Sequence, residues 1–200
     1  MPHAFAAITF TDAVKDAQVL DGSRASYARA FESGGGLENH LLGTLESKFI
    51  ESQRSVYVAT VSETGWPYVQ HRGGPPGFLR VTDPETLVFA DFSGNRQFIT
   101  LGNLVGNARA AMILVDYRRR MRLKLLGLLR SSDSAADLEM VQALSPTYPA
   151  RPRRAMIMQI AAFDWNCPQH IPVRFEEEDV KDQLAERDAR IADLKSRLRT

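Results

Sequence analysis

The chain contains a single cysteine, Cys167, and no long uninterrupted run of apolar residues. One cysteine cannot form an internal disulfide bond, which fits a reducing compartment. No stretch approaches the roughly 20 apolar residues of a membrane-spanning helix, and the first residues lack the basic and apolar regions of a secretory signal. We therefore expect a cytoplasmic protein that does not contact a membrane.

Neither sign of charge dominates, because 25 lysines and arginines balance 24 aspartates and glutamates and leave a net charge of +1. Such a chain has no overall field that would attract nucleic acid or an anionic membrane. We therefore expect no nucleic-acid partner, although a short basic run lies at 118–124.

The motifs of several enzyme classes are also absent. The sequence has no Gly-x-Ser-x-Gly, no His-Glu-x-x-His, no Walker-type loop and no Gly-x-Gly-x-x-Gly after a strand. These absences argue against hydrolase triads, zinc peptidases and the nucleotide sites of P-loop and Rossmann proteins. Cys167 and His170 lie three residues apart, but no other residue shows a matching ligand spacing, so we expect neither a metal site nor a cysteine nucleophile.

What the chain does contain is enough apolar material, 44% of 200 residues, for one hydrophobic core. In the middle of the chain, short β-branched and aromatic segments alternate with turns rich in Gly, Pro and Asp. This pattern predicts an antiparallel sheet that closes as a β-barrel, since closure removes exposed edges. We expect a mainly β fold of six or seven strands, at 55–62, 68–72, 78–81, 86–91, 110–116, 121–129 and 155–163.

Helices are expected on either side of this barrel. Helical spacing and capping residues predict them from Thr9 or Thr11 to Leu20, at 23–33, 41–52 and 95–105, and after Ser131 or Ser134. The composition then divides the chain into an N-terminal helical segment (1–40), a β-barrel (41–173) and a charged, amphipathic C-terminal helix (174–200).

The C-terminal helix carries an apolar stripe, which we call the seam. Its residues recur at alternating four- and three-residue steps, the a/d spacing of a coiled coil with one basic interruption. They are Val180, Leu184, Arg187, Ile191, Leu194 and Leu198. The seam either packs against its own chain or pairs with another chain, and three heptads are marginal for an isolated coiled coil.

One polar turn predicts an anion site. The stretch 91–97, Asp-Phe-Ser-Gly-Asn-Arg-Gln, follows an apolar strand and precedes an apolar-periodic segment. The first N–H groups of a helix have no internal partner and point outward, and Asn95, Arg96 and Gln97 add side-chain donors there. A phosphate-bearing ligand fits such a site; an ordinary helix cap with an exposed arginine is the alternative.

Two further segments carry candidate binding residues. Arg72 ends a strand just before Gly73 and Gly74, which would let a planar ligand approach the backbone; a wide hairpin loop is the alternative. Arg122 and Lys124 alternate with apolar residues and therefore share one face of a strand. Inward cations need an anionic partner, either a phosphate or a carboxylate from a neighbouring strand.

The last candidate segment follows the final strand. Trp165 lies next to Asn166, so an aromatic ring and an amide group could stack on and hydrogen-bond an aromatic ligand.

In order and spacing, these segments resemble the pyridoxamine 5'-phosphate oxidase superfamily, the FMN-binding split β-barrels. The resemblance covers roughly residues 40–170. It rests on the helix 41–52, the strand that ends in Arg72, the turn 94–97, Asn-Ala-Arg-Ala-Ala at 107–111 and Arg-Leu-Lys-Leu-Leu-Gly at 122–127. Within the superfamily, the chain is similar to flavin-binding proteins described only as oxidase-related, through its His-Arg-Gly-Gly-Pro-Pro-Gly and Ser-Gly-Asn-Arg-Gln stretches.

The resemblance implies an FMN cofactor and a set of residues that hold its phosphate. Arg72 and Arg96 would bind the phosphate, with Asn95 in the place of the family's serine. Gln97 stands where the family has a lysine, so one cation is missing there, and Lys124 would compensate for it.

The resemblance also implies how the flavin ring is held. Gly73 and Gly74 would run along the ring, and Arg122 would lie near it. Trp165 and Asn166 would close the ring site from a partner subunit. The expected assembly is therefore a homodimer with two FMN sites at its interface.

The activity implied is that of an FMN-dependent oxidoreductase acting on a small-molecule redox substrate. The Arg-x-His segment with which the vitamin oxidases grip pyridoxal phosphate is absent, since the corresponding region reads Asn-Cys-Pro-Gln-His at 166–170. We therefore expect a substrate other than pyridoxamine phosphate, and we assign no catalytic residue. The alternatives are a non-catalytic flavin- or haem-binding module for storage or sensing, and a coiled-coil assembly factor whose barrel is a scaffold.

Overall fold

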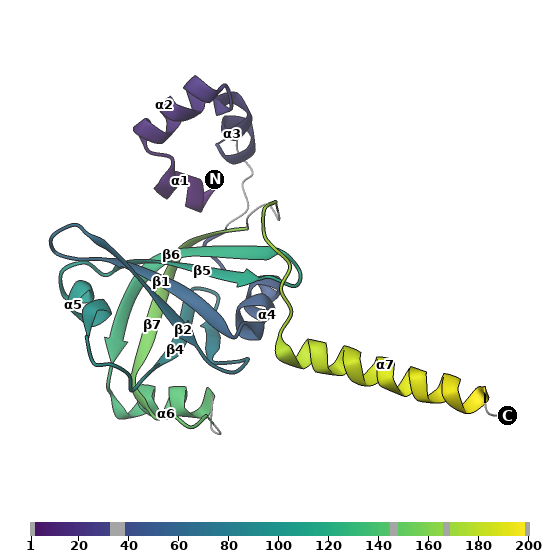
Figure 1. Ribbon diagram of the computed structural model, residues 1–200. Helices are drawn as coiled ribbons and strands as arrows, with labels where there is room; N and C mark the ends of the chain where they lie inside the picture. Colours follow the sequence, from purple (N-terminus) through teal and green to yellow (C-terminus); the bar gives the residue numbers. More distant parts are fainter. Residues whose placement is uncertain (1–2, 33–38, 145–147, 166–168, 199–200) are drawn as a thin grey trace. The chain divides into compact units, whose positions relative to one another are not determined.

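Seven strands in one sheet dominate the chain (Figure 1). The computed structural model describes residues 3–32, 39–144, 148–165 and 169–198. The sheet order is β2-β1-β5-β6-β7-β4-β3, and every strand pair with a described register is antiparallel. The strands are β1 (Ser55–Val61), β2 (Pro67–Gly73), β3 (Leu79–Asp83), β4 (Thr86–Phe92), β5 (Arg109–Asp116), β6 (Met121–Ser132) and β7 (Pro152–Trp165). The prediction of a mainly β fold is confirmed.

The sheet curls on itself. β2 is the first strand in the sheet order and β4 the sixth, yet Arg72 of β2 and Asp91 of β4 form an ion pair of 2.6 Å. A side-chain contact between strands so far apart in the order requires the two ends of the sheet to face each other. The predicted barrel is therefore a split barrel, with β2 and β3 as the edge strands.

The described part of the chain also forms helices, and two of them begin at a capping residue that the sequence indicates. Thr11 caps α2 by accepting the N–H of Val14, and Ser134 precedes α6 and accepts the N–H of Asp137. The six-residue α1 is not predicted, because fewer than two turns give too little periodicity. The helices are α1 (Ala4–Thr9), α2 (Asp12–Asp21), α3 (Arg24–Phe31), α4 (Thr44–Ser52), α5 (Ile99–Gly106), α6 (Ala135–Leu144) and α7 (Glu177–Arg197).

β4 is buried on both faces, and this decides which of its side chains point into the barrel. Val88 and Ala90 pack against Val141 of α6. Phe89 and Asp91 alternate with them along the strand, so they project from the opposite face, toward the barrel interior. The polar Asp91 is thus the last interior residue of an otherwise apolar row.

Asn39 joins the N-terminal helices to the barrel. Its side-chain oxygen accepts the N–H of Ala4 at 2.9 Å, and its amide nitrogen donates to the carbonyl oxygen of Phe163 in β7. The helices themselves are held together by edge-to-face and stacked rings of Phe10, Tyr27 and Phe31.

The residue contacts divide the chain into two compact units. The first, Met1–Val115 with Arg122–Asn166, contains the N-terminal helices and the sheet; the second, Asp116–Met121 with Cys167–Thr200, contains the β5–β6 turn and α7. The predicted division into 1–40, 41–173 and 174–200 stays a prediction. Among the described residues, no helix combines the length and the hydropathy that a bilayer span requires.

A bulge in β6 requires glycine at one position. The β6–β7 register shifts between Leu126 and Gly127. A Cβ atom at Gly127 would lie 2.2 Å from the carbonyl oxygen of Gln159, which is backbone of the paired strand. That oxygen cannot move away without disturbing the ladder between the two longest strands, so the bulge and the glycine depend on each other.

We expect Gly127→Ala to lower the free energy of unfolding by about 3 kcal/mol, because the added methyl group forces β6 and β7 apart. Equilibrium urea denaturation measures the change. Gly102→Ala is the matched control, since Gly102 is an exposed residue of α5 with open space where its Cβ would lie. Alanine there should stabilise by about 0.5–1 kcal/mol. An unchanged midpoint for Gly127→Ala would contradict the described register.

Candidate functional site

A cavity of about 260 Å³ opens where β2, β4, β7 and the segment before α5 meet. We call it the arginine cavity, because four of its described lining residues are arginines. It is lined by Tyr68, Gln70 and Arg72 of β2, Asp91 and Phe92 of β4, residues 93–101, and Arg153 and Arg154 of β7. Alternation along β2 explains the first group, since residues 68, 70 and 72 share one face of the strand.

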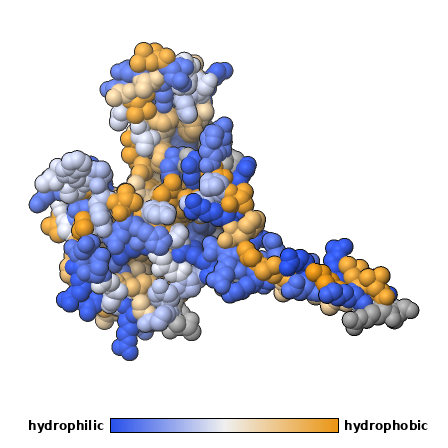
Figure 2. All heavy atoms as spheres, viewed as in Figure 1, coloured by the Kyte–Doolittle hydropathy of each residue, from blue (hydrophilic) through white to orange (hydrophobic). Residues whose placement is uncertain are grey.

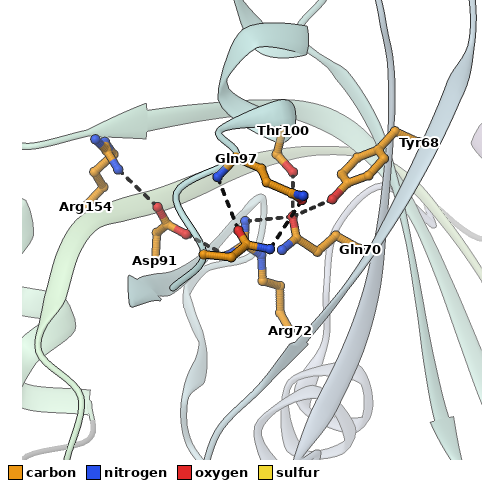
Figure 3. Close-up of polar contacts among 8 residues, drawn as sticks. Tyr68, Gln70, Arg72, Asp91, Gln97, Thr100 and Arg154 are labelled. Carbon is orange, nitrogen blue, oxygen red and sulfur yellow. Dashed lines mark hydrogen bonds and ion pairs between the residues drawn. The ribbon is translucent and has the colours of Figure 1, made fainter. Parts of the chain in front are cut away.

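Asp91 joins two of these arginines (Figure 3). Its Oδ1 accepts a hydrogen bond from Nη1 of Arg72 at 2.6 Å, and its Oδ2 accepts one from Nη1 of Arg154 at 3.3 Å. Asp91 is only 8% exposed, and Arg154 lies directly opposite it in the β4–β7 register. A buried carboxylate requires such partners, so Asp91 fixes the position of both guanidinium groups. We call these three residues the Arg-Asp-Arg row.

Gln70 connects the row to α5 (Figure 3). Its side-chain oxygen accepts hydrogen bonds from the hydroxyls of Thr100 at 3.2 Å and Tyr68 at 3.3 Å, and from Nη2 of Arg72 at 3.5 Å. A second buried contact, from the Asn103 amide to the Thr60 hydroxyl at 2.9 Å, ties the same helix to β1. The first turn of α5 is therefore fixed against the barrel strands.

The polar turn before α5 is longer than the sequence pattern predicts, since the helix begins at Ile99 rather than near Asn95. Asn95 accepts the N–H of Gln97 through its side-chain oxygen at 3.2 Å, a local bond that competes with helix formation. Arg96 and Phe98 adopt left-handed backbone angles, with φ of 62° and 57°. Residues 95–97 therefore reach the arginine cavity from a turn and not from the helix itself.

The arginine cavity is cationic. Arg72, Arg96, Arg153 and Arg154 line it, and Asp91 is the one acidic residue among the described residues that do so. A single carboxylate leaves an excess of positive charge. Guanidinium groups bind phosphate oxygens through charge-assisted and often bidentate hydrogen bonds, so this set of donors suits a dianionic group.

Four of the predicted binding residues thus come together in one cavity: Arg72, Asn95, Arg96 and Gln97. Gly73 and Gly74 line a separate opening of about 570 Å³ with Arg54, His71, Pro75 and Tyr148, which we call the glycine cleft.

An aromatic pair connects the lining of the arginine cavity with that of the glycine cleft. Phe92 lines the former, Tyr148 lines the latter, and their ring centroids lie 4.8 Å apart. Gly74 also has a packing role, because a Cβ there would lie 2.6 Å from Cβ of Phe78. Packing against Phe78 therefore requires glycine at position 74, whether or not a ligand is bound.

Arg122 and Lys124 share one face of β6, as expected, and that face is opposite to the buried Leu123. Nζ of Lys124 lies 3.0 Å from Oδ2 of Asp164 and 4.7 Å from the ring centroid of Phe5. For Lys124, a neighbouring strand thus supplies the carboxylate partner that the sequence offered as one of two possibilities. Neither cation lines the arginine cavity or the glycine cleft as the described residues define them.

Trp165 has a defined role within its own chain. Its indole N–H donates to Oε1 of Glu46 at 2.9 Å, and its ring meets Phe49 edge to face with centroids 4.8 Å apart. These contacts fasten α4 to the end of β7. The neighbouring Asn166 lies outside the described residues.

Several lining residues are not identified from the sequence: Tyr68, Gln70, Thr100, Arg153 and Arg154. The alternation of β2 could have indicated the first two, because they share a face with Arg72. No local signal marks the others, since they reach the cavity through the curl of the sheet and the β4–β7 pairing.

Comparisons with known proteins agree with this fold. A family model described as pyridoxamine 5'-phosphate oxidase matches residues 46–164, more than half of the chain. Comparison with the curated proteins gave no match.

Among solved structures, the fold is similar to that of HupZ from Group A Streptococcus, at 18% identity and a TM-score of 0.53, over 67% of this chain and 100% of that one. A variant of the same protein gives 17% identity and a TM-score of 0.53, over 63% and 100%. An FMN-binding protein from Syntrophomonas wolfei gives 11% identity and a TM-score of 0.49, over 74% and 97%. At these identities the two HupZ structures support the fold alone.

We expect Asp91→Asn to lower the free energy of unfolding by about 3 kcal/mol, because it leaves Arg72 and Arg154 facing each other without a carboxylate. Urea denaturation measures this loss. Added phosphate should restore more stability to the variant than it adds to the parent, since the two guanidinium groups then share an external anion.

Asp83→Asn is the control for Asp91→Asn. Asp83 is exposed, and its Oδ1 accepts the N–H of Glu85, a bond that an asparagine oxygen can also accept. Equal stability of the two variants would mean that the Arg-Asp-Arg row does not hold this part of the barrel together.

Proposed function

Because the chain belongs to the pyridoxamine 5'-phosphate oxidase family, we propose that it binds FMN and acts as an FMN-dependent oxidoreductase. The observation that carries the proposal is the arginine cavity, in which residues from three strands and one turn converge on an excess of positive charge. Its substrate is a small redox molecule other than pyridoxamine phosphate, since the Arg-x-His segment for that ligand is absent from the sequence.

Arg72 and Arg96 bind the phosphate of FMN in this proposal, and Asn95 and Gln97 add neutral donors. Asp91 supports this arrangement, because it holds the Arg72 guanidinium at 2.6 Å and prevents it from moving out to solvent. Gln70 accepts a second hydrogen bond from the same guanidinium. The phosphate therefore meets donors that are already in place, which reduces the entropy lost on binding.

The rest of the cofactor extends beyond the arginine cavity. A volume of about 260 Å³ suits a phosphate group and part of its chain, and is below the usual range for a whole drug-sized ligand. We place the flavin ring along Gly73 and Gly74, in the glycine cleft, where His71 and Tyr148 offer an imidazole and an aromatic ring. When bound, FMN supplies the hydride or electron transfer.

A second copy of the chain completes the site in this proposal. Arg122, Lys124 and Trp165 are not among the described residues that line the two cavities, so in this proposal they approach the flavin, together with Asn166, from the partner subunit. Exposed apolar side chains on one face of the β1–β2 pair support a homodimer in this proposal: Tyr57 is 40% exposed and Val69 60%.

Arg96→Ala tests the phosphate site. Loss of one charge-assisted phosphate contact, worth about 1.5–3 kcal/mol, should raise the Kd for FMN by about 10- to 150-fold. Quenching of FMN fluorescence on titration with protein measures the Kd. Arg80→Ala is the control, because Arg80 is an exposed residue of β3 paired with Glu51. An Arg96→Ala protein that retains the parent affinity would overturn the proposed site.

The oxidoreductase activity is tested separately on the flavin-loaded protein under anaerobic conditions. We expect NADH or NADPH to bleach the yellow flavin absorbance, since an enzyme of this kind must pass electrons through its cofactor. Flavin that dithionite reduces but neither nicotinamide reduces would favour a storage or sensing module. A Soret band in the purified protein would instead indicate haem.

A further inference from the structure

The seam of α7 is exposed along its whole length. Val180, Leu184, Ile191 and Leu194 are between 40% and 50% exposed, and Leu198 is 87% exposed. Figure 2 shows apolar atoms on the surface of α7 among charged ones. An amphipathic helix obtains most of its stability from packing of its apolar face, so a helix of 21 residues with this face in water is marginal.

The start of α7 is nevertheless well fixed within its unit. The side chain of Asp179 accepts a hydrogen bond from Nη1 of Arg118 at 2.5 Å and one from the N–H of Glu176 at 3.4 Å, which closes a capping box. The guanidinium of Arg174 lies 4.5 Å above the ring centroid of Tyr117. The helix thus begins at a defined point on the β5–β6 turn, and the seam continues away from these contacts.

We propose that α7 pairs with α7 of a second copy of this chain as a parallel, in-register, two-stranded coiled coil. The spacing places Leu184, Ile191 and Leu198 at a positions, and Val180 and Leu194 at d positions. In one heptad a β-branched residue at a, Ile191, is followed by leucine at d, Leu194, a pair that favours the parallel dimer; Leu184 at a and Arg187 at d add no such preference.

The charges that flank the seam fit this direction. In a parallel pair, each d residue packs beside the e residue of the other helix, so Arg187 at d lies beside Asp188 of the partner subunit. Two-fold symmetry makes this contact twice, so the arginine that interrupts the seam obtains a carboxylate partner.

The antiparallel alternative brings like charges together. It places Asp188 beside its own copy, Arg190 beside its own copy, and Lys181 beside Lys195. The parallel arrangement retains one like-charge pair, Arg190 with Lys195. Flanking charges of this kind set the orientation of coiled coils, so the balance favours the parallel pair.

Cysteine cross-linking of the full-length chain tests the proposal. In a background in which Cys167 is replaced by serine, Leu194→Cys places a thiol at a d position, where the two copies of a parallel pair lie at the same level. Ala189→Cys, on the opposite face of the helix, is the matched control. Because a disulfide requires Cβ atoms about 4 Å apart, we expect dimer formation in a glutathione redox buffer to be at least about tenfold faster for Leu194→Cys.

A mixture of two cysteine variants distinguishes parallel from antiparallel pairing of the helices. Chains with Leu184→Cys and chains with Leu194→Cys, distinguished by mass, should form only disulfides between like chains if the helices are parallel. Predominant disulfides between unlike chains would overturn the proposal in favour of the antiparallel pair. Equal rates for Leu194→Cys and Ala189→Cys would overturn pairing of α7 altogether.

A substitution that strengthens the pairing of α7 gives a result that misfolding of the variant cannot mimic. Arg187→Leu removes the one polar residue of the seam, so when it is combined with Leu194→Cys it should raise the rate of disulfide formation by about tenfold or more, a readout that dimerisation through the barrel leaves unchanged. An unchanged or lower rate would contradict a buried position for Arg187.

Discussion

The buried carboxylate of Asp91, held between Arg72 and Arg154, is the interaction on which the rest of the structure depends. β2 and β4 are far apart in the sheet order, so the pair with Arg72 is possible only in a curled sheet. An ionised carboxylate without partners is unstable in such a position, and two guanidinium groups without it would repel each other. The ion pairs of Asp91 therefore hold the barrel closed and at the same time fix the positions of its arginines.

The proposed function rests on the excess positive charge of the arginine cavity. Asp91 neutralises one cation, while Arg96 and Arg153 line the same space with further positive charge. Gln70 and Thr100 extend the network to α5, so the turn that carries Arg96 is anchored at its helical end. A rigid, cationic cavity of limited size suits the phosphate end of a cofactor whose larger part lies outside, and this agrees with the family of the chain.

The sequence predicts the elements of this fold well and the site in part. Segments rich in β-branched and aromatic residues locate the seven strands, and helical spacing locates most of the helices. Both patterns depend only on neighbouring residues. Arg72 and the turn 95–97 are also local signals, since an arginine at a strand end and a polar turn are visible without a partner. Arg154 and Thr100 are not visible in this way. Their roles arise from the β4–β7 register and from the contact of α5 with β2, which no local pattern specifies.

The central claim is that the arginine cavity recognises a phosphate and thereby selects the cofactor. Calorimetric titration of the parent protein with FMN and with riboflavin tests it most directly, because the two ligands differ only by the phosphate. The account predicts that FMN binds at least about 100-fold more tightly, as expected for two charge-assisted contacts. Equal affinity for the two ligands would contradict it.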